Sequence, residues 1–189
     1  QVSVPDMVGV LGHADALSLM LSVGGMPFLI DPGTFAYHTQ KKWRDYFRGT
    51  SAHNTVRIDG QDQSVIGGNF MWLAKAKANC EQWSSDEGCD QFVGSHDGYM
   101  RLGDPVLHRR TIDFDKTARV FTVIDEISCQ ATHGVELFWH FAPGCSVSLS
   151  AKQVTASHGA QRLLMDFYGD ESVADNAAIS QAVALGADV

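Results

Sequence analysis

Short apolar runs with a period of two residues recur along the chain, and they limit the folds available to it. Between Ala14 and Val23, the residues Leu17, Leu19 and Leu21 fall on one face of an extended segment, and residues 134–141 alternate in the same way. Gly, Asp, Asn and Ser separate these runs, and 18 glycines stand against only 5 prolines. This pattern favours an all-β chain over a helical one.

The periodicity predicts a series of short strands joined mostly by tight turns. We expect strands at Ala14–Val23, Met26–Ile30, Asn54–Ile58, Phe70–Ala78, Val106–Phe114, Ala118–Ile127, Gly134–Phe141, Ser146–Thr155 and Gln161–Phe167. Turns are expected at Gly24–Gly25, Asp59–Gly60 and His158–Gly159. Strands at this spacing favour two packed antiparallel sheets. Residues 171–189, which are rich in alanine and lack aromatic residues, are expected to be a tail, a short helix or a truncated continuation.

Composition excludes several classes of protein. With 189 residues and 44% apolar content, the chain can form one large domain or two small ones around a buried core. Its net charge of -8, from 14 basic and 22 acidic residues, argues against a nucleic-acid partner. No apolar run reaches the roughly 18 residues of a membrane span, and the N-terminus lacks the features of a signal peptide.

The four cysteines are spaced too widely for a zinc ribbon. Cys80 and Cys89 could close one loop as a disulfide, and the four residues allow three connectivities in all. We favour free, mostly buried thiols over disulfides.

His13, Asp31 and His53 are the leading candidates for a binding site. Imidazole nitrogens and a carboxylate are usual ligands of Zn²⁺, and three protein ligands leave one position for water or substrate. In the alternative interpretation, the histidines are hydrogen-bonded at strand ends and Asp31 caps a turn. A hairpin turn at Gly24–Gly25 would place Asp31 opposite Ser18, so a shared ion requires a bend, a bulge or another register.

Two tyrosines could carry acid or base chemistry. Tyr37 and Tyr46 lie in loop-like sequence near Trp43, Arg44 and Arg48. Neighbouring cations can lower the pKa of a tyrosine so that it acts as a base, and a neutral tyrosine can act as an acid. The alternative is that these aromatic residues simply cover a sheet edge.

Other motifs of catalysis are missing from the sequence. It contains no glycine-rich phosphate loop, nucleophile elbow, HExxH helix or cysteine-based zinc motif. His108 and His140 lie within apolar strands and are interpreted as core or edge histidines.

Several distinctive motifs occur in order over roughly residues 8–145: GHADALSLMLSVGG, DPGTFAY, WRDYFRGTSAHNTV, DGQDQS, HRRTIDF, FTVIDEI and FWHFAPG. This ordered set resembles the C-terminal region of the heparinase II/III-like family of polysaccharide lyases. The resemblance implies an antiparallel two-sheet β-sandwich, supersandwich-like, over residues 1–170. In the family, an N-terminal α/α toroid usually packs on this sandwich, and this sequence is expected to lack it.

The resemblance also implies an activity. Family members cleave uronic-acid-containing polysaccharides by β-elimination: the C5 carboxylate is neutralised, the C5 proton is removed and the C4 oxygen is protonated as it leaves. The carboxylate-binding Asn and a Tyr belong mainly to the toroid. The implied partners are an acidic polysaccharide and an upstream toroid, with no nucleic acid or membrane, and the implied location is the periplasm or the cell exterior.

Carried over by position, His13 matches the second His of the family's His-x-His segment, Asp31 the Asp after the next strand, and His53 the His of the AHN motif. In related enzymes these three hold a metal, commonly zinc, that largely shapes the site. Leu11 stands where the catalytic first His is expected. Two explanations fit this replacement. The chain is a pseudo-enzyme or divergent member of the family, or its first dozen residues are not the native junction with the preceding sequence.

Three functions therefore stay open. The first is the sandwich portion of a polysaccharide lyase, inactive by itself, with Tyr46 or Tyr37 as the sandwich-side acid or base. The second is a non-catalytic glycan-binding or structural module, and the third is a cupin-like or other metal-dependent β-protein. Whether the chain is an enzyme is left undecided between them.

Overall fold

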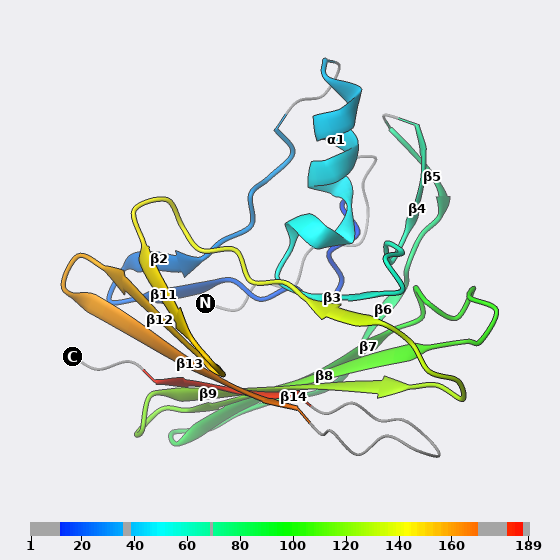
Figure 1. Cartoon of the computed structure of the whole chain (residues 1–189). Coiled ribbons are helices and arrows are strands. Elements are labelled where there is room, and N and C mark those ends of the chain that lie inside the picture. Colours follow the sequence, from blue (N-terminus) through cyan, green and yellow to red (C-terminus); the bar gives the residue numbers. More distant parts are fainter. Residues whose placement is uncertain (1–11, 36–38, 69, 170–180, 187–189) are drawn as a thin grey trace.

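The computed structural model describes residues 12–35, 39–68, 70–169 and 181–186 of the chain (Figure 1). Within these residues the protein consists mainly of antiparallel strands in two layers, as the alternating pattern predicts. No helix in the described residues is long and apolar enough to cross a membrane.

The larger layer is one sheet with the strand order β11-β12-β13-β14-β9-β8-β7-β6. Its strands are β6 (Ala78–Ser85), β7 (Cys89–His96), β8 (Leu107–Asp115), β9 (Val120–Ser128), β11 (Ser146–Ser150), β12 (Gln153–His158), β13 (Gln161–Gly169) and β14 (Gln181–Gly186). Every neighbouring pair is antiparallel. Buried residues alternate with more exposed ones along β8 and β9, so one face of the sheet is covered.

The smaller layer consists of short strands. β1 (Leu21–Val23) pairs with β2 (Met26–Leu29), and β3 (Val56–Ile58) pairs with β10 (Val135–Leu137). An isolated bridge joins Leu29 of β2 to Phe141, in the segment that follows β10. Figure 1 shows them lying over one face of the larger sheet, which confirms the predicted two-layer sandwich.

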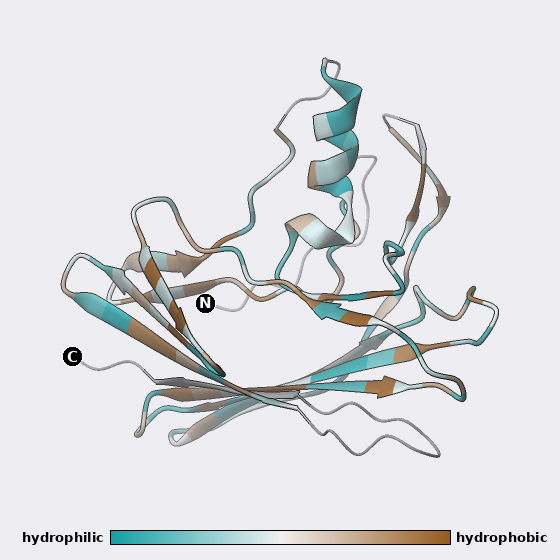
Figure 2. Ribbon diagram, in the orientation of Figure 1, coloured by the Kyte–Doolittle hydropathy of each residue, from teal (hydrophilic) through white to brown (hydrophobic). Residues whose placement is uncertain are grey.

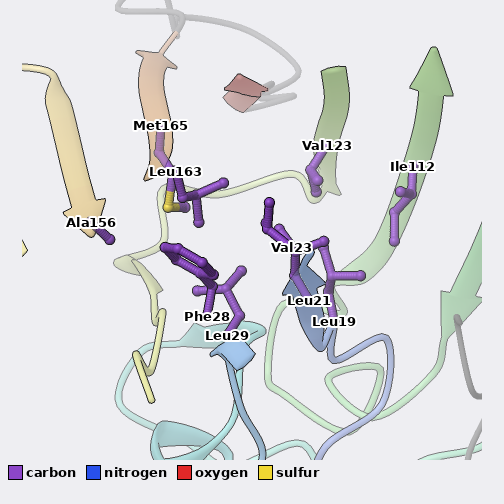
Figure 3. Packing of buried hydrophobic residues seen from close by; sticks show 10 residues of the cluster. All are labelled: Leu19, Leu21, Val23, Phe28, Leu29, Ile112, Val123, Ala156, Leu163 and Met165. Atoms are coloured by element: carbon purple, nitrogen blue, oxygen red, sulfur yellow. The ribbon is translucent and has the colours of Figure 1, made fainter. Parts of the chain in front are cut away.

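The main core lies between the layers. Leu19, Leu21, Val23, Phe28 and Leu29 of the smaller layer pack against Ile112, Val123, Ala156, Leu163 and Met165 of the larger one (Figure 3). Hydrophobic residues occur along strands of both layers (Figure 2). Full burial of each large apolar side chain contributes about 1.5–3 kcal/mol, so this contact is the main force that joins the layers.

A helix and a hairpin project from the smaller layer on the side away from the large sheet (Figure 1). They are α1 (Lys41–Arg48), which the 3-10 turn η1 (Thr50–Ala52) follows, and the hairpin of β4 (Val65–Gly68) and β5 (Met71–Ala74). The guanidinium of Arg48 lies 4.3 Å from the ring centroid of Trp72, and its Nη1 donates to the Gly68 carbonyl at 2.7 Å. These contacts join the helix to the hairpin.

Several predicted strands have different limits in the structure. Ala14–Val23 is a strand only at Leu21–Val23, and Gly134–Phe141 only at Val135–Leu137. The single strand predicted at Ser146–Thr155 is wrong, because a turn in which Ala151 has a φ of 45° divides it into β11 and β12. Alternation of side chains continues through such bends and does not reveal them.

Residues 181–186 form β14 between β13 and β9. This part of the C-terminal segment is therefore a strand inside the sheet rather than a tail or a short helix. The sequence QAVALG has little alternation of polar and apolar residues. Its position in the sheet depends on pairing with β13 on one side and β9 on the other.

None of the four cysteines forms a disulfide, as we expect from the sequence. The expectation that they are mostly buried is wrong for Cys80 and Cys89, which are exposed on the edge and turn of the β6–β7 hairpin.

A buried ion pair connects the large sheet to the smaller layer. Arg110 of β8 is fully buried, and its Nε and Nη2 donate to the two carboxylate oxygens of Asp125 on β9 at 2.7 and 2.8 Å. Its Nη1 donates to the carbonyls of Leu17 and Asn54 at 2.7 and 2.8 Å. Burial alone would raise the pKa of Asp125, but Arg110 and a hydrogen bond from His108 lower it strongly, so the carboxylate is ionised.

A chain of two buried histidines extends this ion pair. The Gly98 N–H donates to His96 Nδ1, which leaves the His96 proton on Nε2 to be donated to His108 Nδ1 at 3.0 Å. The His108 proton then lies on Nε2 and is donated to Asp125 at 2.7 Å. His108 is thus a core histidine, as predicted.

We predict that Arg110→Met lowers the free energy of unfolding by about 3–5 kcal/mol, because it leaves the Asp125 carboxylate buried without its cation. Arg57→Met is the matched control: Arg57 pairs with Glu136 at the surface, so the expected loss is below about 1 kcal/mol. Urea unfolding of the two variants measures both values. Equal losses would contradict the role given to Arg110.

We also predict that His96 makes the fold sensitive to acid. Burial lowers the pKa of His96 well below its ordinary value, and the nearby His108 and Arg110 lower it further. The folded state therefore keeps His96 neutral where the unfolded state binds a proton, so this contribution to stability is lost as the pH falls below about 6.5.

In urea unfolding at pH 7 and pH 5, His96→Gln should show a smaller loss of stability on acidification than the unsubstituted protein. The difference is at most about 2 kcal/mol, the value for one proton over 1.5 pH units. An identical loss in both proteins would refute the assignment to His96.

Candidate functional site

The three predicted ligands meet in space, and a fourth residue joins them. His13, Asp15, Asp31 and His53 each present a ligand atom, and these atoms all lie within 4.8 Å of one another. They come from three separate segments: the residues before β1, the loop after β2 and the residue after η1. Asp15 was not predicted, although its position two residues after His13 was a usable signal.

The required bend exists in the β1–β2 hairpin. Strand pairing ends at Leu21 and Leu29, and the register shifts between Leu21 and Ser22. Before β1 the chain turns: the Ser18 N–H donates to the Asp15 carbonyl at 3.0 Å, and Leu17 has a positive φ of 62°. The chain before β1 therefore leaves the hairpin register, and His13 comes within reach of the loop that follows β2.

Asn54 fixes the segments around the cluster. Its side-chain Nδ2 donates to the carbonyls of Leu19 and Ile30 at 2.8 and 3.0 Å, and its Oδ1 accepts the His140 N–H at 2.6 Å. Ile30 directly precedes Asp31, and Asn54 directly follows His53. One buried amide thus sets the backbone beside two of the predicted ligands.

His53 is the buried member of the cluster. It is fully buried, its Nδ1 lies 2.9 Å from Asp31 Oδ2, and its Nε2 is buried without a hydrogen-bond partner. With the ring proton on Nδ1, Nε2 presents a bare lone pair. A buried nitrogen without a partner costs free energy, and an ion or a donor bound beside it would satisfy this atom.

The protonation states of the cluster suit a cation. Burial lowers the pKa of His13, and the charges of His53 and Arg44 lower it further against the opposing effect of Asp15 and Asp31. Burial alone would raise the pKa of Asp31, but the hydrogen bonds from His53 and the Gly33 N–H outweigh it and lower this pKa. A neutral imidazole and an ionised carboxylate are the forms that bind a metal.

His13 is positioned from two sides. Its Nε2 shares a hydrogen bond of 2.7 Å with Thr34 Oγ1, and its ring stacks on that of His53 with the centroids 5.0 Å apart. His140, interpreted as a core or edge histidine, is half-buried beside the cluster, and its Nε2 lies 3.0 Å from the Ser51 carbonyl. It supports η1 and so the segment that presents His53.

An exposed aromatic group adjoins the cluster. Phe35 follows Thr34 and stacks on Phe47 of α1, with the ring centroids 5.3 Å apart. Tyr46 contacts Phe47 and Trp43 edge to face, at 5.2 and 6.1 Å. Phe35, Trp43 and Tyr46 are each between 43% and 59% exposed, so these rings are accessible beside the ligands.

The predicted catalytic residues have different outcomes. Tyr46 lies on the exposed side of α1 within the aromatic group, and its role as acid or base stays a prediction. Tyr37 lies outside the described residues, as does Leu11. Arg44 and Arg48, expected beside the tyrosines, are buried between α1 and the β4–β5 hairpin.

Comparison with known proteins shows a shared fold and a family. The crystal structure of heparan sulfate lyase HepC from Pedobacter heparinus aligns with a TM-score of 0.67 and 20% sequence identity, over 93% of this chain and 28% of that chain. A mutant of the same lyase gives the same values. This likeness shows a shared fold, and the chain spans a little over a quarter of that lyase.

No curated protein matches the sequence. A sequence model of the family described as "Heparinase II/III-like, C-terminal" matches residues 2–184, which is nearly the whole chain and includes the four residues of the cluster. The resemblance seen in the ordered motifs is confirmed, and the chain belongs to the heparinase II/III-like family, of which it matches the C-terminal region.

Proposed function

We propose that this chain is the C-terminal sandwich of a polysaccharide lyase that cleaves an acidic, uronic-acid-containing polysaccharide by β-elimination. The observation that carries the proposal is the convergence of His13, Asp31 and His53, three residues that the motif resemblance matches to metal ligands of related enzymes. The family and the heparan sulfate lyase with the same fold support the substrate class. On the same ground we propose a periplasmic or secreted location.

The cluster is proposed to hold a zinc ion. The donor set of two imidazoles and one or two carboxylates fits this metal. A bound cation would also satisfy the buried Nε2 of His53, which has no hydrogen-bond partner. His13, Asp31 and His53 would be its ligands, with Asp15 beside them. When bound, the ion would supply a fixed positive charge that holds three chain segments together and attracts an acidic sugar.

The aromatic group is proposed to receive the sugar. The faces of aromatic rings stack on the apolar faces of pyranose rings, and Phe35, Trp43 and Tyr46 lie exposed beside the cluster. In this arrangement the hydroxyl of Tyr46 is the sandwich-side group available to move a proton at C5 or at the C4 oxygen. The remaining groups would come from the toroid, so the chain alone is proposed to be inactive.

Leu11 favours a second candidate function. With leucine in the place of the family's catalytic histidine, the same cluster and aromatic group could bind glycan without cleaving it. A non-catalytic module would need the stacking surface and the fixed fold, and no proton transfer.

We predict that the natural full-length protein releases an unsaturated uronate from at least one acidic polysaccharide, such as heparan sulfate or alginate. The measurement is the ultraviolet absorbance of the product, with this chain alone as the comparison.

Tyr46→Phe in the full-length protein should reduce kcat by about 10²–10⁴-fold with a smaller change in KM, because it removes a proton-transfer group and keeps the ring.

Retained glycan binding without any unsaturated product would support the non-catalytic module instead. Loss of binding in Trp43→Ala, with Trp83→Ala unaffected, would place that binding on the aromatic group, since Trp83 is an exposed tryptophan on the distant edge strand β6.

We predict that Asp31→Asn and His53→Ala each remove one equivalent of bound zinc and abolish the rise in melting temperature that zinc produces. His158→Ala is the control, because this half-buried histidine lies outside the cluster and its one described hydrogen bond is to the Pro27 carbonyl. Elemental analysis and thermal unfolding measure the two effects. Unchanged zinc content in both cluster variants would exclude the metal site.

A further inference from the structure

A second cluster of ligand-type side chains lies where three loops meet, apart from the proposed glycan site. His133, in the loop between β9 and β10, lies between two carboxylates: its Nδ1 is 2.6 Å from Asp59 Oδ2, and its Nε2 is 3.0 Å from Asp104 Oδ2. Asp59 follows β3, and Asp104 lies between β7 and β8. Cys129, at the end of β9, completes the group.

The donor atoms of this cluster are close enough to share an ion. Ligand atoms of Asp104, Cys129 and His133 all lie within 4.8 Å of one another. We propose that Asp104, Cys129 and His133 form a second metal site, which takes a zinc-class divalent cation, and that Asp59 orients His133 for it. This inference is independent of the proposed glycan cleavage.

The chemistry of the donors selects this class of metal. Thiolate, imidazole and carboxylate together suit Zn²⁺ and not Mg²⁺ or Ca²⁺, which prefer oxygen ligands alone. Three protein ligands leave a fourth position of the tetrahedron for water. Binding replaces the Nε2 proton of His133 and the thiol proton of Cys129 by the metal, and both protons pass to solvent.

The surrounding residues already hold two of the ligands in place. Asp104 Oδ2 accepts the N–H groups of Gln130 and Ala131 at 3.0 and 2.7 Å. Asp59 accepts the Gly134 N–H at 2.8 Å as well as contacting His133 Nδ1. A carboxylate on the far nitrogen of a metal-binding histidine is the usual support of such a ligand, and Asp59 is in that position.

Cys129 distinguishes a metal site from a simple ion-pair network of His133 with Asp59 and Asp104. His133 with its two carboxylates would be satisfied without a thiol. The structure nevertheless places the Cys129 sulfur within 4.8 Å of ligand atoms of both Asp104 and His133. A metal ion would neutralise this concentration of negative groups and join three loops that border the second core cluster around Tyr99 and Ile127.

Cobalt titration of the intact, reduced chain after chelator treatment distinguishes the two clusters. Co²⁺ bound to a thiolate shows a sulfur-to-metal charge-transfer band in the near ultraviolet, and the His13 cluster contains no sulfur. We expect one equivalent of Co²⁺ to generate this band, and we expect the band to persist in Asp31→Asn. Cys129→Ser should lose it, whereas Cys145→Ser, at another partly buried cysteine, should retain it.

A second variant tests the orienting role of Asp59. Asp59→Asn should keep the band and weaken Co²⁺ binding by about 10–100-fold, the usual effect of losing such a support. Circular dichroism confirms folding of each variant before titration. Absence of the band in the folded, unsubstituted chain, or a band that Cys129→Ser leaves unchanged, would overturn the proposal.

Discussion

A single buried guanidinium group determines how the two layers of this protein fit together. Arg110 binds both oxygens of Asp125 within the large sheet and donates to the carbonyls of Leu17 and Asn54 in the smaller layer. Leu17 lies four residues after His13, and Asn54 directly follows His53. Since a buried charge without its partners would cost several kcal/mol, the backbone around the His13, Asp31 and His53 cluster is held to one position relative to the sheet.

The smaller layer needs such side-chain bonds because its strands are short. β1, β3 and β10 have three residues each, so their ladders contain few main-chain hydrogen bonds. Asn54 and Arg110 supply bonds to this layer, and the fully buried Tyr99 adds another from its hydroxyl to the Val56 carbonyl at 2.9 Å. Both candidate metal clusters occur near the ends of these short strands. A cation bound there would connect segments that few main-chain hydrogen bonds hold together.

The alternating pattern predicted three long strands well, but it missed β6 and β7, which have eight residues each, and it predicted the irregular strands poorly. β8, β9 and β13 lie close to their predicted limits, because each has one buried face along its length. Helix α1 was not predicted: it has only eight residues, and what holds it, such as the contact of Arg48 with Trp72, comes from the β4–β5 hairpin. β14 was also missed, since its place depends on neighbours and not on its own pattern.

The site shows the same division between local and distant causes. His13, Asp31 and His53 could be proposed from the sequence because each lies in a local motif that resembles one of the family, and the structure brings them together. The bend that allows this depends on Arg110, 93 residues from Leu17, and on Asn54, 35 residues from Leu19. Both residues are polar in segments that read as ordinary strand or loop, and only the fold reveals their partners. In this chain, local motifs supply the candidate ligands. The packing of the two layers supplies the buried polar contacts that bring these ligands together.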